Sequence, residues 1–186
     1  KLRAVASDIR SANEAIAKGK LDEARRHYQT VLKKLPDHKK ATRGLTALRD
    51  VQVRIRRVRA DPDDTKTRYQ VMDDLFDLGA YGMAMQHNQA LRKRNYKPFD
   101  IERYRGYILV RQRKWRKALR VFKSLSKQRA DSQSLRTWLE YTKARALLAR
   151  VPSDTKARLW LAESQEEQEN FDSAIAEYRR VLENKR

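Results

Sequence analysis

The chain has 186 residues, and its 44 lysines and arginines against 24 acidic residues give a formal net charge of +20. It contains no cysteine, which excludes disulfides and thiolate metal sites, and no apolar run reaches the ~18 residues that a membrane-spanning helix needs. Scarce glycine and proline, with abundant alanine, leucine, arginine, lysine and glutamate, predict an all-α chain. The charge favours an anionic partner, which leaves nucleic acid, acidic protein segments, acidic polysaccharide and anionic membrane surfaces open.

The two ends of the sequence predict a piece of a longer protein. The chain opens on Lys1 without a methionine and stops inside a helical pattern at Arg186. The absence of a signal peptide therefore says nothing about the parent protein. Its compartment stays unknown, with the cytoplasm and the bacterial periplasm both open.

Four segments of the chain share one helical pattern built around a small alanine, and two of these alanines lie 34 residues apart. Two antiparallel helices joined by a tight turn need a small residue where their axes approach most closely. A bulky aromatic residue one turn later then fills the space beside it. The segments are "AKGKLDEARRHYQTVL" (17–32), "DLGAYGMAMQHNQAL" (77–91), "VRQRKWRKALRVFKSL" (110–125) and "EQENFDSAIAEYRRVL" (167–182), with alanines Ala24, Ala84, Ala118 and Ala174 and aromatics Tyr28, Phe122 and Tyr178, while Asn88 replaces the aromatic in the second.

Two longer helical stretches, 39–60 and 132–150, lie between these segments. Each runs into a similar joint, "RADPDDTKTRYQ" (59–70) and "ARVPSDTKARLW" (149–160). Asp64 and Asp154 have the position of N-caps that follow a proline-induced stop. The sequence therefore predicts two related halves, each with a long helix between two hairpins.

These features resemble the tetratricopeptide repeat family, whose unit is a 34-residue helical hairpin. The first unit carries the resemblance through Gly19, Leu21, Ala24, Tyr28, Val31, Leu32 and Pro36, the second through Gly79, Tyr81, Ala84 and Leu91, the third through Gly106, Trp115, Ala118 and Phe122, and the last through Leu161, Ala162, Phe171, Ala174, Tyr178 and Val181. The resemblance implies an α-solenoid of antiparallel helical hairpins forming a right-handed superhelix, with about four repeats and two interposed longer helices. We expect one domain over 1–186 with approximate units 5–38, 39–60, 65–98, 99–131, 132–150 and 155–186.

In this family the first helix of each hairpin lines a concave groove that holds a partner segment. The resemblance places three residues of the third unit and three of the following helix on that face, each set at helical spacing. Guanidinium and aromatic groups together suit acidic peptides, and they also suit the bases and phosphates of RNA or acidic sugars. The alternative is that the aromatic members belong to the core between helices. The predicted partner-binding residues are Arg103, Tyr107, Arg111, Trp138, Tyr141 and Arg145.

The sequence gives little support to an enzyme. His27, His38 and His87 share no metal-ligand spacing, and neither a phosphate-binding glycine loop nor a nucleophile motif occurs. The carboxylate-rich run at 163–170 is best interpreted as a solvated helix face. We therefore expect neither catalysis nor a cofactor or metal.

The predicted function is that of a non-enzymatic scaffold in a multi-protein assembly, binding an acidic partner segment in a basic and aromatic groove. The alternative is direct binding of an anionic polymer, either RNA or acidic polysaccharide. The first and last units show no obvious polar capping helix, so self-association through the ends of the repeat array is a further hypothesis.

Overall fold

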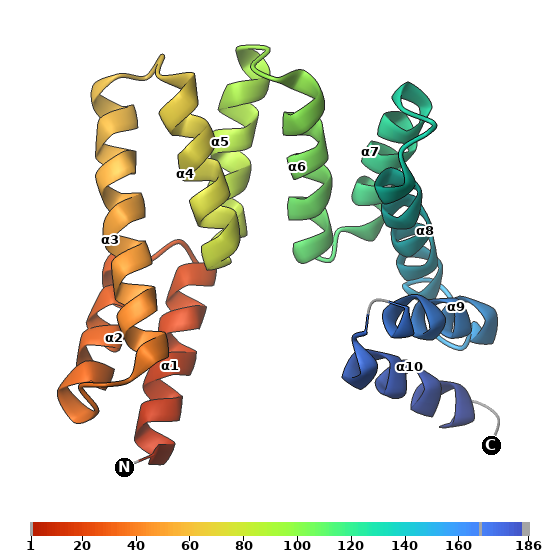
Figure 1. Ribbon diagram of the computed structural model, residues 1–186, viewed down its shortest axis with the longest axis horizontal. Helices are drawn as coiled ribbons and strands as arrows, with labels where there is room; N and C mark the ends of the chain where they lie inside the picture. Colours follow the sequence, from red (N-terminus) through yellow and green to blue (C-terminus); the bar gives the residue numbers. More distant parts are fainter. Residues whose placement is uncertain (1, 168, 184–186) are drawn as a thin grey trace. The chain divides into compact units, whose positions relative to one another are not determined.

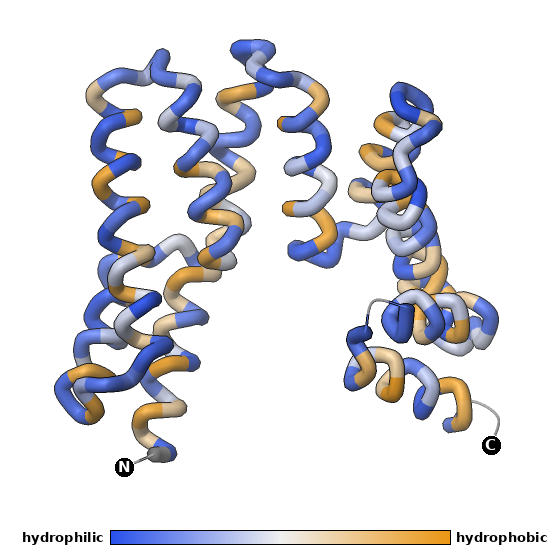
Figure 2. The backbone as a smooth tube through the Cα atoms, viewed as in Figure 1, coloured by the Kyte–Doolittle hydropathy of each residue, from blue (hydrophilic) through white to orange (hydrophobic). Residues whose placement is uncertain are grey.

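The computed structural model describes residues 2–167 and 169–183, which form ten helices and no strand (Figure 1). Figure 2 shows apolar and polar residues alternating along the helices, as amphipathic helices require. In chain order the helices are α1 (Leu2–Ala17), α2 (Leu21–Lys34), α3 (Lys39–Ala60), α4 (Thr65–Leu78), α5 (Tyr81–Lys93), α6 (Pro98–Arg111), α7 (Trp115–Gln128), α8 (Gln133–Leu148), α9 (Thr155–Glu166) and α10 (Phe171–Glu183).

The order of the helices confirms the predicted all-α solenoid of helical hairpins. The pairs α1–α2, α4–α5, α6–α7 and α9–α10 are each joined by a short turn, and α3 and α8 lie between them. The interposed helix α3 is the longest at 22 residues, whereas α8 has 16 residues, as many as α1. None of the helices in the described part of the chain combines the length and apolar composition that crossing a membrane requires.

The backbone contacts divide the chain into two compact units, Lys1–Ile101 and Glu102–Arg186. The first unit holds α1 to α5 and the start of α6, and the second holds the rest of α6 and α7 to α10. Each unit has its own buried apolar residues. The expectation of a single domain over the whole chain stays a prediction.

Small residues let the helices of the first unit approach closely. Ala24 and Ala84 are fully buried, as the repeat pattern predicts. Tyr28 is also buried and lies against Gly44 of α3, where an added Cβ would come within 2.6 Å of the tyrosine ring. At the equivalent position of α5, Asn88 is fully buried and its side-chain Nδ2 donates a 2.8 Å hydrogen bond to the Ile101 carbonyl. The amide therefore replaces aromatic packing with a polar contact to the next helix.

The second unit repeats this packing around Phe122. Ala118 and Phe122 are fully buried, and a Cβ on Gly106 of α6 would come within 2.7 Å of the phenylalanine ring. In α10, Ala174 is buried, but Tyr178 is only partly buried and its hydroxyl donates to Glu166 at 2.9 Å. The aromatic residue of the last hairpin is therefore less enclosed than those of α2 and α7.

The two joints before α4 and α9 use the same hydrogen bonds, which confirms the predicted N-caps. Asp64 accepts from the Thr67 backbone N–H at 2.9 Å, and Asp154 accepts from Ala157 at 2.7 Å. One arginine in each following helix also donates to the proline carbonyl of its joint, at 2.8 Å from Arg68. Each aspartate satisfies an otherwise unpaired amide of the first turn, so the sequence pattern fixes where the helix begins.

Candidate functional site

A hollow of about 670 Å³ opens in the second unit, and all of its walls belong to that unit. The end of α6 and the start of α7 form one side, and α8, α9 and α10 form the others. It holds five arginines against one glutamate, together with a tryptophan and a tyrosine. The lining residues are Val110, Arg111, Arg113, Trp115, Tyr141, Arg145, Leu148, Ala149, Arg158, Ser173, Ala176, Glu177 and Arg180.

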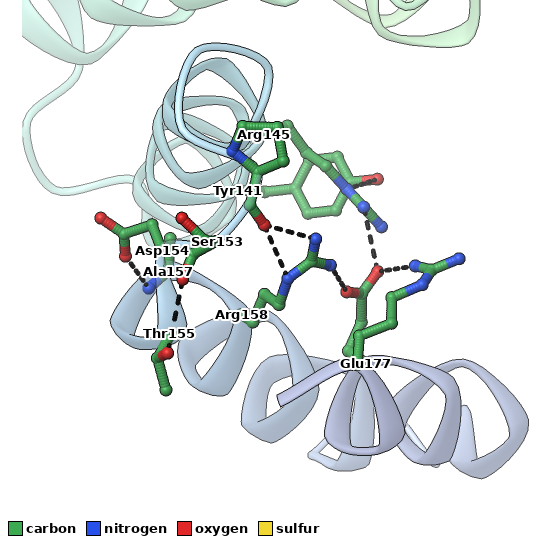
Figure 3. Close-up of polar contacts among 10 residues, drawn as sticks. Tyr141, Arg145, Ser153, Asp154, Thr155, Ala157, Arg158 and Glu177 are labelled. Atoms are coloured by element: carbon green, nitrogen blue, oxygen red, sulfur yellow. Dashed lines mark hydrogen bonds and ion pairs between the residues drawn. The ribbon is translucent and has the colours of Figure 1, made fainter. Parts of the chain in front are cut away.

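A buried carboxylate from α10 organises three of the arginines (Figure 3). The Glu177 side chain is only 4% exposed, and it lies on the same helix face as the buried Ala174 and Val181. Its Oε1 accepts from Arg145 Nη1 at 3.1 Å and from Arg180 Nη1 at 2.9 Å, and its Oε2 accepts from Arg158 Nη1 at 3.1 Å. A buried charge needs such partners, because burying it unpaired costs several kcal/mol.

Arg158 is held at both ends of its guanidinium. Its Nε and Nη2 donate to the Pro152 carbonyl at 3.0 and 2.5 Å, while its Nη1 reaches Glu177 (Figure 3). Asp154 caps the first turn of α9, and its backbone carbonyl accepts the Arg158 N–H at 3.2 Å. The joint sequence therefore positions a charged group of the hollow as well as starting a helix.

Aromatic side chains form a second part of the wall. The Trp115 and Tyr141 rings meet edge to face with centroids 6.3 Å apart. The Arg145 guanidinium lies over the Tyr141 ring at 5.5 Å, and its Nε donates to the tyrosine hydroxyl at 3.4 Å. Stacking of this kind holds a guanidinium in place.

The structure brings together three of the six predicted site residues in this hollow, namely Arg111, Tyr141 and Arg145. The others lie outside its lining. Tyr107 and Trp138 pack together with ring centroids 5.0 Å apart, beside the buried Phe122.

Burial raises the pKa of the Tyr107 hydroxyl, and the nearby positive charge of Arg103 acts in the opposite direction. Tyr107 and Trp138 thus take part in packing between helices, the alternative considered for the aromatic residues. Arg103 lies beside this aromatic packing rather than in the lining of the hollow.

Within residues 2–167 and 169–183, no group of three or more histidine or carboxylate side chains is arranged to hold a metal ion. The charged and aromatic side chains that line the hollow can form forked hydrogen bonds to an anion and contacts with a planar or apolar group.

A comparison with known protein families finds a match in two stretches of the chain. The model described as Tetratricopeptide repeat matches residues 9–45 and 142–186, which cover the first hairpin and the last. These two stretches of the chain match tetratricopeptide repeats. Such repeats generally mediate protein–protein interaction and act as scaffolds, because stacked helical hairpins present extended surfaces.

Two solved structures align with almost the whole chain. One is the crystal structure of a tetratricopeptide repeat protein from Parabacteroides merdae, 14% identical, covering 98% of this chain and 80% of that one with a TM-score of 0.46. The other is the crystal structure of MamA protein, 16% identical, covering 99% of this chain and 93% of that one with a TM-score of 0.38. A comparison with curated proteins finds no significant match.

The site residues predicted from the 34-residue repeat pattern did not include Glu177, Arg158 or Arg180. A signal for the first was present, since a glutamate between Ala174 and Val181 stands on the core face of an amphipathic helix and calls for cationic partners. A signal for the second was the repeated joint, in which an arginine follows the proline by six residues at both Arg68 and Arg158. Arg180 could have been found once Glu177 was recognised, because it lies three residues later on the same helix and can pair with it.

Proposed function

We propose that this chain is a non-enzymatic scaffold whose second unit binds an acidic segment of a partner protein in the arginine-lined hollow, as part of a multi-protein assembly. The observation that carries the proposal is the hollow's composition, five arginines against one glutamate with two aromatic side chains in the wall. Tetratricopeptide repeat proteins are typically scaffolds rather than enzymes, and that family role agrees with a hollow whose chemistry is recognition.

The arginines of the hollow keep N–H donors for a ligand, although Arg158 already uses all three of its guanidinium nitrogens on Glu177 and Pro152. A guanidinium has five N–H donors, and Glu177 takes up one terminal nitrogen from each of Arg145, Arg158 and Arg180. Arg111 and Arg113 are exposed at the end of α6. A carboxylate entering the hollow can therefore accept paired N–H bonds, which are the strong and directional form of this interaction.

The aromatic side chains favour a peptide over a bare polyanion. Tryptophan, tyrosine and arginine dominate the binding energy of protein interfaces, because they offer large contact areas at low entropic cost. Trp115 and Tyr141 lie beside the arginines rather than elsewhere on the unit. An acidic segment that also carries an apolar or aromatic residue would use both parts of the wall.

The second candidate is direct binding of RNA or an acidic polysaccharide, favoured by the net charge of +20. The two candidates differ in their dependence on salt. A polymer binder that neutralises several phosphates loses roughly 10³-fold or more in affinity between about 50 and 200 mM salt, whereas a peptide anchored by aromatic and paired contacts loses far less.

Fluorescence anisotropy would test the proposal with a labelled peptide of alternating glutamate and tyrosine, and with single-stranded RNA of equal charge. We expect Arg111→Glu to weaken peptide binding by about tenfold or more, because a charge in contact with the ligand is reversed. Arg120→Glu makes the same change of charge on α7 outside the hollow and should shift binding about twofold at most.

Equal loss of affinity in the two variants would show that only overall charge matters and would contradict the site. Binding of RNA alone, with a steep loss between the two salt concentrations, would replace the peptide proposal with the polymer candidate.

A further inference from the structure

The last helix presents a stripe of apolar side chains to solvent. Phe171, Ile175 and Leu182 on α10 are 57%, 46% and 64% exposed, and the partly buried Tyr178 lies between them in sequence. Their spacings of four, three and four residues put all four on one side of an α-helix. Three large exposed apolar side chains in one row on a 13-residue helix mark a contact surface rather than scattered exposure.

Equivalent positions earlier in the chain show what kind of element covers such a face. Tyr28 of α2 packs against Gly44 of α3, and Phe122 of α7 stacks on Trp138 of α8 with centroids 5.7 Å apart. In each case a further helix lies on the residue four positions after the small alanine. The equivalent residue on α10 is Tyr178. It is only partly buried, and the apolar residues of the stripe on either side of it are exposed.

We propose that the α10 stripe is the contact surface of a two-fold symmetric dimer, with a second copy of this chain supplying the covering helix. The stripe is self-complementary when two copies of α10 run antiparallel about a point between residues 176 and 177. Phe171 then faces the partner's Leu182, and Ile175 faces the partner's Tyr178. A two-fold contact uses the same patch twice and closes on itself, so it makes a dimer and not a filament.

The charges beside the stripe favour the same arrangement. Asp172 and Arg179 are exposed and each directly follows a stripe residue, so both lie on the same edge of the stripe. In an antiparallel helix pair, residues on this edge meet their counterparts across the two-fold axis. Asp172 then lies near the partner's Arg179, and the contact occurs twice. In a parallel pair this edge would face the opposite edge of the partner helix, and Asp172 would not meet the partner's Arg179.

The dimer surface is separate from the arginine-lined hollow. The hollow takes Ser173, Ala176, Glu177 and Arg180 from α10, and none of the four stripe residues lines it. A contact limited to one helix face is small by the standards of stable complexes, so we expect a reversible dimer. Because the faces differ, dimerisation and ligand binding can occur together.

Sedimentation equilibrium of the whole chain over a hundredfold range of concentration tests the inference. The wild-type mass should rise from that of one chain to that of two and then stop. Ile175→Glu should weaken self-association by at least tenfold, because it places a charge in the centre of the apolar contact. Val53→Glu is the matched control, since Val53 is an equally exposed apolar residue, 49% exposed, on α3.

Charge-reversal variants test the antiparallel arrangement itself. Asp172→Arg and Arg179→Asp should each lose self-association, and an equimolar mixture of the two should associate again because every cross-pair then has opposite charges. A wild-type mass that stays at one chain, a mass that grows beyond two, a loss in Val53→Glu equal to that in Ile175→Glu, or a mixture that stays monomeric would each overturn the inference. Circular dichroism confirms that the variants remain helical.

Discussion

Glu177 shows how one residue links the stability of the last hairpin to the candidate binding surface. Its side chain stands on the buried face of α10 and carries a charge that three arginines from α8, α9 and α10 compensate. Arg158 is the most enclosed of the three at 15% side-chain exposure, and Arg180 is half exposed. The strength of the cluster therefore lies mainly in the bonds from Arg158 and Arg145.

Replacing Glu177 with glutamine should destabilise the second unit by about 2–3 kcal/mol. The change keeps the shape but leaves the largely enclosed guanidinium of Arg158 without its counter-charge. The loss is at or below the bottom of the range for fully buried pairs, because the arginines are partly exposed and Arg180 can turn to solvent. Urea unfolding measures the effect. Glu183→Gln removes an exposed charge from the same helix and should change the stability by less than about 0.5 kcal/mol. Equal effects in the two variants would contradict the role given to the cluster.

A second residue-scale prediction concerns the pH dependence of the first unit. Burial, assisted by the positive charge of Arg68, lowers the pKa of His87 from 6.5 to about 4. Since the unfolded chain binds this proton more tightly, the stabilisation is complete above pH 6.5 and is lost as the pH falls towards 4. The loss should reach about 2 kcal/mol, because solvent screening reduces the full effect of the shift.

Urea unfolding of the wild type and His87→Gln between pH 4 and 7 checks this. Glutamine cannot titrate, so the variant should show a shallower dependence over that interval. Parallel curves for the two proteins would show that His87 is not the source of the effect.

At the scale of the helices, close approach depends on two glycines. An added Cβ would come within 2.6 Å of the Tyr28 ring at Gly44 and within 2.7 Å of the Phe122 ring at Gly106, whereas Gly82 of α5 has open space around it. Gly44→Ala and Gly106→Ala should each destabilise the chain by about 1–3 kcal/mol through overpacking. Gly82→Ala should stabilise it by about 0.5–1 kcal/mol, because alanine favours an exposed helix.

Thermal or urea unfolding of the three alanine variants distinguishes packing from helix propensity. A stabilising effect in all three would mean that the helices can move apart at no cost, which would contradict the close packing.

The helices were predictable from sequence because their signals are local. Periodicity, the small alanines and the aspartate caps at Asp64 and Asp154 depend on neighbours within a few residues. The site was only partly predictable. Arg111, Tyr141 and Arg145 followed from the 34-residue repeat pattern, whereas Arg158 and Glu177 come together only through tertiary packing. The frame also could not show that Tyr107 and Trp138 pack on Phe122, because the same spacing suits an inter-helix contact and a groove.

At the scale of the molecule, the net charge of +20 opposes folding through self-repulsion. Screening by salt should therefore raise the urea midpoint between about 20 and 300 mM sodium chloride. The exposed ion pairs act in the other direction, but each contributes only about 0–1 kcal/mol, so repulsion should dominate. A midpoint that falls with added salt would mean that the ion pairs outweigh the net charge.

The proposed function requires an acidic segment to bind among the arginines of the second unit. The most direct measurement is a titration of the ¹⁵N-arginine-labelled chain with the glutamate–tyrosine peptide, following each side-chain Nε–H signal by NMR. We expect the largest shifts on Arg111, Arg113, Arg145 and Arg180, which line the hollow, and no change on Arg120. Shifts spread evenly over the arginines of both units, or largest in the first unit, would contradict it.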